Sequence, residues 1–320
     1  MISRERENIQ EALGETINRW MAEPDTTDVI LNPPLEGEDH GRIWVTRLGH
    51  HREPVGFMPA DQAMRLIGMV ASTMKRSATA DTPSVEGTLI TDGSRFQACI
   101  PPNTQGGPFF AIRRKAIRVF PFDEYVAHGL LKERQREIIE DAIRKRLNIV
   151  VVGGTGSGKT TFLNAIIDAM TKIHPHHRFF GIEEVSELQC TAPDRTFTLT
   201  SASMSIRDLV KMAMRSFADR ILIGEARGPE MLDVLMAWNT GHPGGAATVH
   251  CDVTTPEAAL DRIELLLLLA NPAPLHRLVA RAVGLIVCLQ LDEDTGARRV
   301  TQIVRVHGHD GQNYNLTTET

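Results

Sequence analysis

Eight consecutive residues near the middle of the chain have the composition of a loop that binds phosphate. Residues 153–160 read GGTGSGKT and match the pattern G-x-x-x-x-G-K-[ST] in full. The four glycines let backbone N–H groups approach phosphate oxygens without obstruction by Cβ atoms. Lys159 can neutralise β- and γ-phosphate oxygens, and the hydroxyl group of Thr160 can hold Mg²⁺. The pattern predicts an ATP site, and a glycine-rich turn that binds nothing is the less favoured alternative. The residues expected to line the site are Gly153, Gly154, Thr155, Gly156, Ser157, Gly158, Lys159, Thr160 and Thr161.

Two apolar segments further along the chain each end in carboxylates. Residues 179–184 end in Glu183 and Glu184, and residues 220–225 end in Glu225. If both segments are neighbouring strands of one parallel sheet, their ends lie beside the phosphate loop. Carboxylates there can hold the water shell of Mg²⁺ or act as a general base. We therefore predict a hydrolysis centre, with solvated loop acids as the alternative.

A histidine and a pair of arginines are further candidates. His250 ends the apolar segment 246–250, which follows a glycine-rich turn at 240–245. Taken alone, a histidine of this kind is more often a half-buried structural residue. Phosphoryl transfer also needs cations that stabilise charge on the γ-phosphate. Arg113 and Arg114 could supply such charge, or could be ordinary surface residues.

The elements that must position these residues follow two patterns. Up to residue 118, short strand-like segments and two amphipathic helices predict a small α+β domain. Residues 119–130 are predicted to be a hinge linker. Over residues 131–320, helical and all-apolar segments alternate, which predicts a doubly wound α/β domain. The predicted helices cover residues 2–21, 61–76, 131–147, 159–173 and 265–270, and the predicted strands cover residues 28–31, 42–45, 87–91, 95–100, 109–113, 148–152, 178–183, 220–224, 246–250 and 284–290.

Composition narrows the class of protein further. The 320 residues carry a formal net charge of −5, and 42% of them are apolar, as in ordinary globular proteins. The first residues lack the apolar core of a signal peptide, and no apolar run approaches the roughly 20 residues that cross a bilayer. The four cysteines are isolated, which predicts reduced thiols in the cytoplasm. A metal at His174, His176 and His177 is conceivable, but a solvated loop is the favoured interpretation.

Together these segments resemble the secretion traffic ATPases, and most closely the TrbB-type conjugal transfer ATPases of type IV secretion. The resemblance covers nearly the whole chain. It is densest in four boxes in the order and spacing of the family: residues 148–161, 182–188, 219–227 and 239–250. It implies a RecA-like C-terminal domain preceded by a PAS-like N-terminal domain. It also implies ATP and Mg²⁺ as ligands.

The same resemblance implies partners and a location. It implies a homohexameric ring in the cytoplasm that docks on inner-membrane components of the machine. Peripheral association with the membrane is left open. The matching family motifs imply that Glu183 is the general base, that Glu225 is the partner of the Mg²⁺ water, and that His250 is the sensor of the γ-phosphate. Arg113 and Arg114 would reach the nucleotide from the N-terminal domain, and residues 120–125 would act as the hinge for domain closure.

Three positions depart from the family pattern. Ala218 precedes Asp219 where a proline is usual, Cys251 stands where alanine is usual, and Glu184 stands where many relatives have aspartate. None of these removes a catalytic group, so they bear on local geometry rather than on activity.

Two other functions remain as alternatives. A motor that moves single-stranded DNA is one, but the chain is acidic and only 5% aromatic, so stacking platforms are scarce. A phosphotransferase is the other, and no segment specifies its second substrate pocket or lid. GTPases usually carry Asn-Lys-x-Asp for guanine, and the sequence has no such tetrapeptide.

Overall fold

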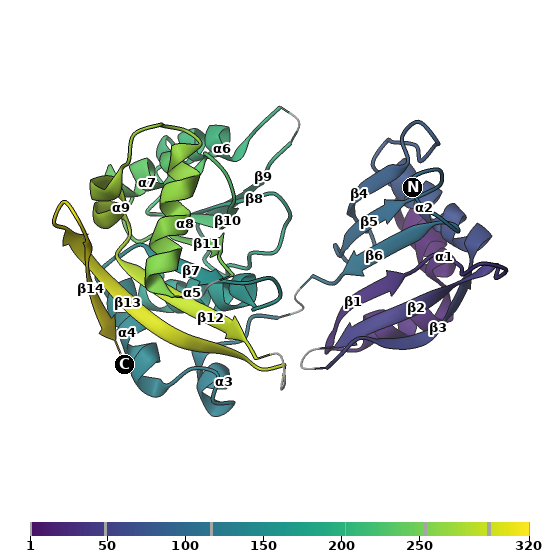
Figure 1. Cartoon of the computed structure of the whole chain (residues 1–320), viewed down its shortest axis with the longest axis horizontal. Coiled ribbons are helices and arrows are strands. Elements are labelled where there is room, and N and C mark those ends of the chain that lie inside the picture. The colour runs from purple at the N-terminus through teal and green to yellow at the C-terminus, as the bar shows by residue number, and fades with distance from the viewer. Residues whose placement is uncertain are drawn as a thin grey trace. The chain divides into compact units, whose positions relative to one another are not determined.

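The chain forms two compact units, Met1–Ile117 (unit 1) and Arg118–Thr320 (unit 2), each with its own sheet and hydrophobic core. The computed structural model describes residues 2–47, 50–115, 118–201, 203–252, 255–292 and 296–319. Figure 1 shows the helices and strands of both units. The predicted mixed α/β class is confirmed.

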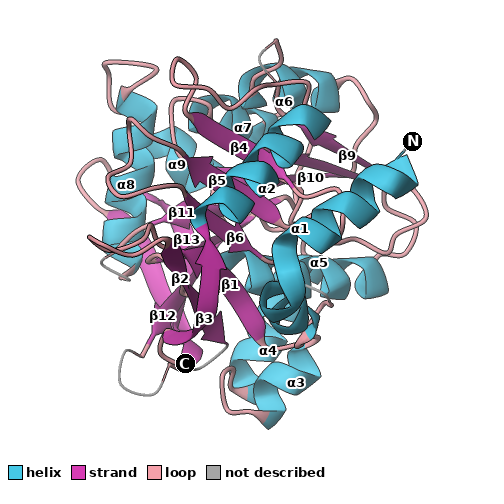
Figure 2. Ribbon diagram, turned by 90° about the vertical axis from the view of Figure 1, so that its right-hand side faces the viewer, coloured by secondary structure: helices cyan, strands magenta, loops and turns pink. Residues whose placement is uncertain are grey.

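Unit 1 is an antiparallel sheet with two helices packed on one face (Figure 2). Its strands lie in the order β3-β2-β1-β6-β5-β4. Ile9, Leu13 and Ile17 repeat every four residues, so they lie on one side of the first helix and are buried in the core. The elements are α1 (Ile2–Ala22), β1 (Thr26–Leu31), β2 (His40–Arg47), β3 (Glu53–Pro59), α2 (Ala60–Thr73), β4 (Ser84–Thr88), β5 (Arg95–Cys99) and β6 (Phe109–Arg113).

Two parts of unit 1 differ from the sequence prediction. The strand predicted at 87–91 is β4, which ends at Thr88, because Leu89 begins a turn in which its N–H donates to the carbonyl of Ser94 at 2.8 Å. Strand β3 was not predicted, since Pro54 and Gly56 are residues that strands usually exclude.

Unit 2 is built on an eight-stranded mixed sheet in the order β14-β13-β12-β7-β11-β10-β8-β9. The six strands from β12 to β9 pair in parallel, and β13 and β14 continue the sheet in antiparallel fashion. The elements are α3 (Phe122–Ala127), α4 (Glu133–Arg144), β7 (Ile149–Gly153), α5 (Lys159–Ile173), β8 (Phe179–Glu183), β9 (Arg195–Leu199), α6 (Ile206–Met214), β10 (Arg220–Ala226), α7 (Met231–Asn239), β11 (Ala246–His250), α8 (Pro256–Leu268), α9 (His276–Ala282), β12 (Leu285–Leu291), β13 (Arg298–His309) and β14 (Tyr314–Glu319).

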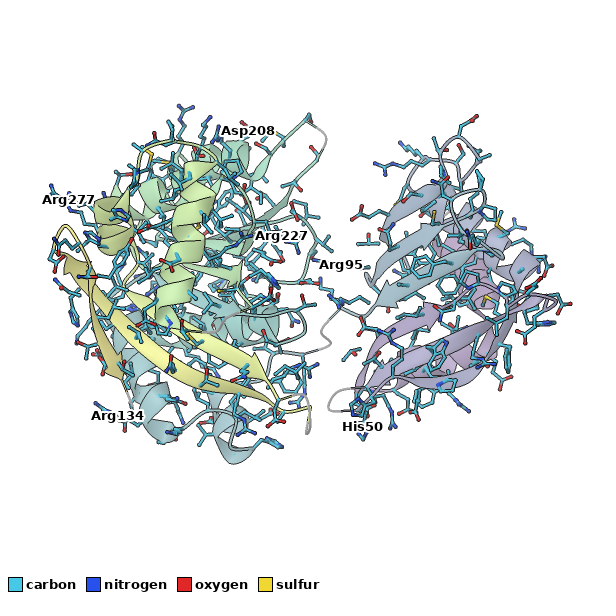
Figure 3. All side chains as sticks on the ribbon, viewed as in Figure 1. His50, Arg95, Arg134, Asp208, Arg227 and Arg277 are labelled. Carbon is cyan, nitrogen blue, oxygen red and sulfur yellow. The ribbon has the colours of Figure 1, made fainter. Side chains whose placement is uncertain are left out.

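Helices cover both faces of this sheet because its central strands are apolar on both sides. In β7, Val150 and Val152 belong to the core formed with α6, α7, α8 and α9. Ile149 and Val151 point to the other face, where α3, α4 and α5 pack. Exposed charged side chains lie outside these layers, as Arg134 on α4 and Arg277 on α9 show in Figure 3.

The segment predicted as a linker contains a short helix, α3. Its Phe122 and Tyr125 are buried and contact Phe162 of α5, with ring centroids 5.7 and 5.2 Å apart. These contacts belong to unit 2, and the hinge role of the segment stays a prediction.

Candidate nucleotide-binding site

The phosphate loop lies between the end of β7 and the start of α5, in the context that its sequence pattern requires. Gly156 and Gly158 have φ angles of 75° and 86°, a region in which residues with a Cβ are strained. Gly153 is required for another reason. A Cβ atom there would lie 2.4 Å from the Oγ of Ser157 and 2.7 Å from the carbonyl oxygen of Leu289. The loop therefore needs glycine at these three positions to keep its shape.

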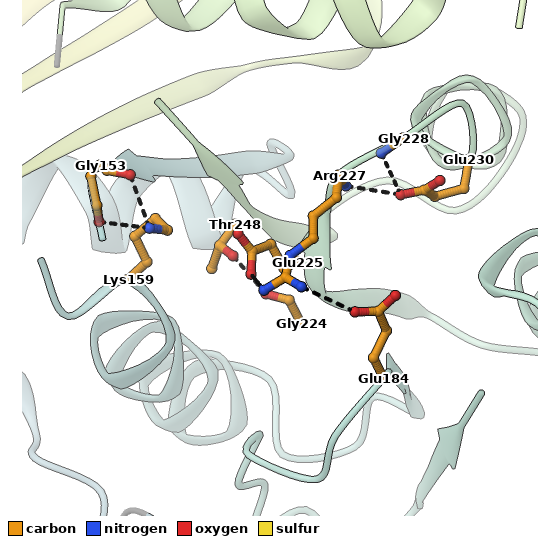
Figure 4. A network of polar contacts seen from close by, with 10 residues as sticks. Gly153, Lys159, Glu184, Gly224, Glu225, Arg227, Gly228, Glu230 and Thr248 are labelled. Atoms are coloured by element: carbon orange, nitrogen blue, oxygen red, sulfur yellow. Dashed lines mark hydrogen bonds and ion pairs between the residues drawn. The ribbon is translucent and has the colours of Figure 1, made fainter. Parts of the chain in front are cut away.

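Lys159 extends back over the phosphate loop. Its Nζ donates to the carbonyl oxygens of Gly153 and Gly154 at 2.9 and 2.8 Å (Figure 4). Thr160 and Thr161 follow in the first turn of α5 and are partly exposed. The first N–H groups of a helix have no intrahelical partner and carry partial positive charge, so this end of α5 attracts an anion.

Strand β11 brings His250 next to the phosphate loop. His250 pairs with Gly153 across the two parallel strands, and the N–H of Cys251 donates to the Gly153 carbonyl at 3.1 Å. The half-buried ring of His250 has its Nε2 3.0 Å from Oδ1 of Asp252. Cys251 is buried and takes part in the contact with Gly153 through its backbone.

Glu225 lies at a β-bulge in β10. Ile223 pairs with Ala247 of β11, but the next paired residue, Ala226, lies opposite Val249, so β10 carries one extra residue. Bulges of this kind redirect side chains and are frequent beside active sites.

The carboxylate of Glu225 is paired with an arginine. Its Oε2 is 2.6 Å from Nη2 of Arg227, and Nη1 of that arginine is 3.4 Å from Oε2 of Glu184. The pKa of Arg227 is raised, mainly by the hydrogen bond to Glu225. Partial burial is the next largest influence and acts to lower this pKa. Glu230 fixes the turn after β10, since its Oε1 accepts the N–H groups of Arg227 and Gly228, both at 2.8 Å. Figure 4 shows this network.

The carboxylate of Glu183 is buried and hydrogen-bonded to the backbone, which the sequence did not indicate. Glu183 is only 3% exposed, and its Oε1 accepts the backbone N–H groups of Glu187 and Leu188, both at 2.7 Å. A Cβ atom on Gly224 of the adjacent strand would lie 3.2 Å from its Cγ. The segment after β8, which carries Glu187 and Leu188, thus folds back on the carboxylate that ends the strand.

The structure brings four strand ends together and leaves the two arginine candidates in unit 1. The ends of β7, β11, β10 and β8 carry Gly153, His250, Glu225 and Glu183, and these strands are successive neighbours in the sheet. Arg113 and Arg114 bind partners within unit 1.

Nε of Arg113 is 3.0 Å from Oδ1 of Asp28. The Arg114 guanidinium donates to the carbonyl of Thr26 at 3.3 Å and also to that of Glu23, and burial lowers its pKa.

Two further residues at this site were missed by the sequence analysis. Thr248 donates from Oγ1 to the carbonyl of Gly224 at 2.6 Å. Arg298, the first residue of β13, donates from Nε to the carbonyl of Gly156 at 2.7 Å. Thr248 could have been found, because it lies two residues before His250 in the same predicted strand. Arg298 carries no local sequence signal.

The residues present fit a nucleoside triphosphate with Mg²⁺. The glycine backbone, Lys159 and the α5 N-terminus form an anion site, and the Thr160 hydroxyl makes no hydrogen bond to other described residues. In the described part of the chain, no group of three or more His, Cys, Asp or Glu side chains is arranged to hold a metal ion.

A phosphate loop at the end of a central parallel strand, with acids at the neighbouring strand ends, defines a P-loop nucleotide-binding unit. Residues 38–309 match the family described as type II/IV secretion system protein. The chain belongs to this family, and the predicted resemblance is confirmed.

Two curated relatives and one solved structure illustrate the similarity. The chain is 36% identical over 311 residues to the probable conjugal transfer protein TrbB of Sinorhizobium fredii, covering 97% of this chain and 92% of that protein. It is 36% identical over 306 residues to the conjugal transfer protein TrbB of Rhizobium radiobacter, covering 96% and 91%. The fold is similar to that of the ATPase DotB of Yersinia pseudotuberculosis, with a TM-score of 0.63, 17% identity and coverage of 88% of this chain and 75% of that chain.

Within the described residues, no helix is long and apolar enough to cross a membrane.

Proposed function

We propose that the chain is a Mg²⁺-dependent ATPase that powers a type IV secretion or conjugation machine. The observation that carries this proposal is the row of strand ends in unit 2, where the phosphate loop, His250, Glu225 and Glu183 lie side by side. Family membership and the two TrbB relatives support the choice of machine.

Each residue of the row has a proposed task. Lys159 and the α5 N-terminus would bind the β- and γ-phosphates and stabilise charge that develops during transfer. Mg²⁺ would neutralise phosphate charge when bound, with Thr160 as a ligand and Glu225 holding its water shell. Glu183 would accept the proton of the attacking water. His250, which pairs with the first residue of the loop, would sense the γ-phosphate.

The assembly is part of the proposal. We infer a cytoplasmic homohexamer, docked on inner-membrane components of the machine, with a PAS-like unit 1 and a RecA-like unit 2. Arg113 and Arg114 would complete the nucleotide site from unit 1, and residues 119–130 would act as the hinge. The antiparallel sheet of unit 1 and the parallel core of unit 2 are consistent with these two assignments.

A phosphate-release assay combined with sizing tests the proposal. Purified protein should release free phosphate from ATP when Mg²⁺ is present and lose that activity when the metal is chelated. Light scattering should show a hexameric mass that ATP stabilises. Transfer of phosphate to a metabolite in place of its release would contradict the proposal. Turnover that depends on single-stranded DNA at low salt would instead favour the nucleic-acid motor.

A further inference from the structure

Arg298 reaches the phosphate loop from a strand that lies far from it in the sequence. Its Nε donates to the carbonyl oxygen of Gly156 at 2.7 Å, across a separation of 142 residues. Its side chain also runs along the loop, since a Cβ atom on Gly158 would lie 3.1 Å from the Cδ of Arg298. The side chain is half-buried. Arg298 is therefore hydrogen-bonded to one of the loop's two glycines with positive φ angles and lies close to the other.

The strand that carries Arg298 belongs to the same sheet as the strand that carries the loop. Arg298 pairs with Leu291 of β12, and β12 pairs in parallel with β7. Two residues further on, the N–H of Val300 donates to the carbonyl of Leu130 at 2.9 Å. The guanidinium group is thus presented from a paired segment rather than from a free loop.

The contact fixes one peptide plane of the loop. A peptide unit is planar, and its C=O and N–H groups point in opposite directions. Holding the Gly156 carbonyl toward Arg298 therefore sets the direction of the N–H group of Ser157, one of the loop amides that phosphate oxygens approach in such a site. Contacts inside the loop also restrain this peptide unit, since the N–H of Ser157 donates to the carbonyl oxygen of Gly154 at 3.4 Å and the Oγ of Ser157 donates to the same oxygen at 2.9 Å. Glycine has no side chain to restrict its own backbone, so Arg298 adds a restraint from outside the loop.

We propose that Arg298 is a positioning residue for nucleoside triphosphate binding, which acts by holding the Gly156 carbonyl and so presents the loop amides to the phosphates. This proposal rests on the proposed function. It assigns Arg298 a hydrogen-bonding task toward the protein backbone and gives it no contact with the reacting atoms. Binding should depend on Arg298 more than the rate of the chemical step does.

Substitutions of Arg298 and of its neighbour test the proposal in the full-length protein. The probe is the fluorescent nucleotide N-methylanthraniloyl-ADP, and ATP turnover is measured in parallel. Arg298→Ala should weaken binding of the probe and raise KM for ATP roughly ten- to a hundredfold, the range for losing one charged hydrogen bond, with kcat at saturating ATP nearly unchanged. Arg299→Ala is the matched control, because Arg299 is exposed and its Nη2 lies 3.1 Å from Oδ2 of Asp292.

A third substitution tests whether Arg298 acts by its hydrogen bond to the backbone or by its positive charge. Arg298→Gln keeps a neutral N–H donor, so it should restore part of the binding lost in Arg298→Ala. This comparison keeps the proposal testable even where the alanine variant is less stable than the wild type. If Arg298→Lys restored binding and Arg298→Gln did not, the positive charge would be what matters, and the proposal would be overturned. Equal binding by Arg298→Ala and Arg299→Ala would overturn it as well, while leaving the ATPase proposal standing. A wild-type protein that neither binds the probe nor hydrolyses ATP would contradict both.

Discussion

Thr248 donates a hydrogen bond of 2.6 Å from its Oγ1 to the carbonyl oxygen of Gly224, in the bulge of β10 that also contains Glu225. The side chain of Thr248 is buried, with only 1% of the residue exposed. A threonine in the middle of β11 therefore fixes the backbone that directs the proposed metal-water ligand in β10.

Removing the hydroxyl group of Thr248 should lower both the stability of the protein and its ATP turnover. Thr248→Val keeps the shape of the side chain but leaves the Gly224 carbonyl without its donor, at a cost of about 1–3 kcal/mol in the free energy of unfolding. Because the bulge directs Glu225, we expect turnover to fall roughly ten- to a hundredfold. Urea unfolding and phosphate release measure the two effects. Thr248→Ser retains the hydroxyl and should stay close to wild type, and equal loss in both variants would contradict the assignment.

Lys159→Ala should lower ATP turnover by about a hundredfold or more, since it removes a charge that stabilises the γ-phosphate. The fold should persist, because the ammonium group is held at the loop itself, where it donates to the carbonyls of Gly153 and Gly154. Phosphate release and thermal unfolding check both parts. Lys172→Ala, near the other end of α5 and exposed, is the control and should leave turnover unchanged.

Glu183→Gln should trap bound ATP. The amide oxygen of glutamine can still accept the N–H groups of Glu187 and Leu188, so the variant should fold normally, but it cannot take up the proton of the attacking water. A filter-binding assay should show retained, unhydrolysed ATP. Glu183→Ala should differ, because two backbone donors lose their acceptor and stability falls as well. Normal hydrolysis by Glu183→Gln would make Glu225 or another group the base.

The stability of unit 2 should fall as the pH is lowered below about 6.5. Nε of Arg220, which is fully buried, donates to Nδ1 of His177 at 3.1 Å, so this nitrogen must be unprotonated. Burial, together with the charge of Arg220, lowers the pKa of His177 from 6.5 to about 4. Between these two values the unfolded chain binds a proton that the folded chain does not, so stability is complete above pH 6.5 and is lost as the pH falls toward 4.

Urea unfolding between pH 7.5 and 4.5 measures this dependence. His177→Gln, whose amide oxygen can accept from Arg220 without titrating, should reduce the pH dependence. His176→Gln is the control, since His176 is exposed and makes no described hydrogen bond, and it should behave as the wild type. An unchanged slope in His177→Gln would contradict the prediction.

The parts of the site that could be predicted are those written in consecutive residues. The apolar run before Gly153, and those before Glu183 and Glu225, predict buried parallel strands, and the structure has them as β7, β8 and β10. The bulge in β10 could not be predicted in this way, because it depends on pairing with β11. The contact between Arg298 and Gly156 also depends on tertiary structure, since 142 residues separate the two.

The edge of the large sheet was missed for a related reason. Buried and exposed residues alternate only in part along β13, and β14 has no fully buried residue, so neither strand contains the all-apolar run that marks the central strands. Helix α3 is only six residues long, too short for a helical period to show. What stabilises it is non-local, since Phe122 and Tyr125 pack against Phe162.

The position of β11 between β7 and β10 limits how this protein can change during evolution. His250 and Thr248 lie on one face of β11, one paired with the phosphate loop and the other bonded to the bulge at Gly224. Inserting or deleting a single residue in β11 would move both side chains to the opposite face at once. Replacement of its buried apolar residues by others of similar volume should be tolerated far better. We therefore expect related chains to vary in length at the turns around β11 and to keep its length of five residues fixed.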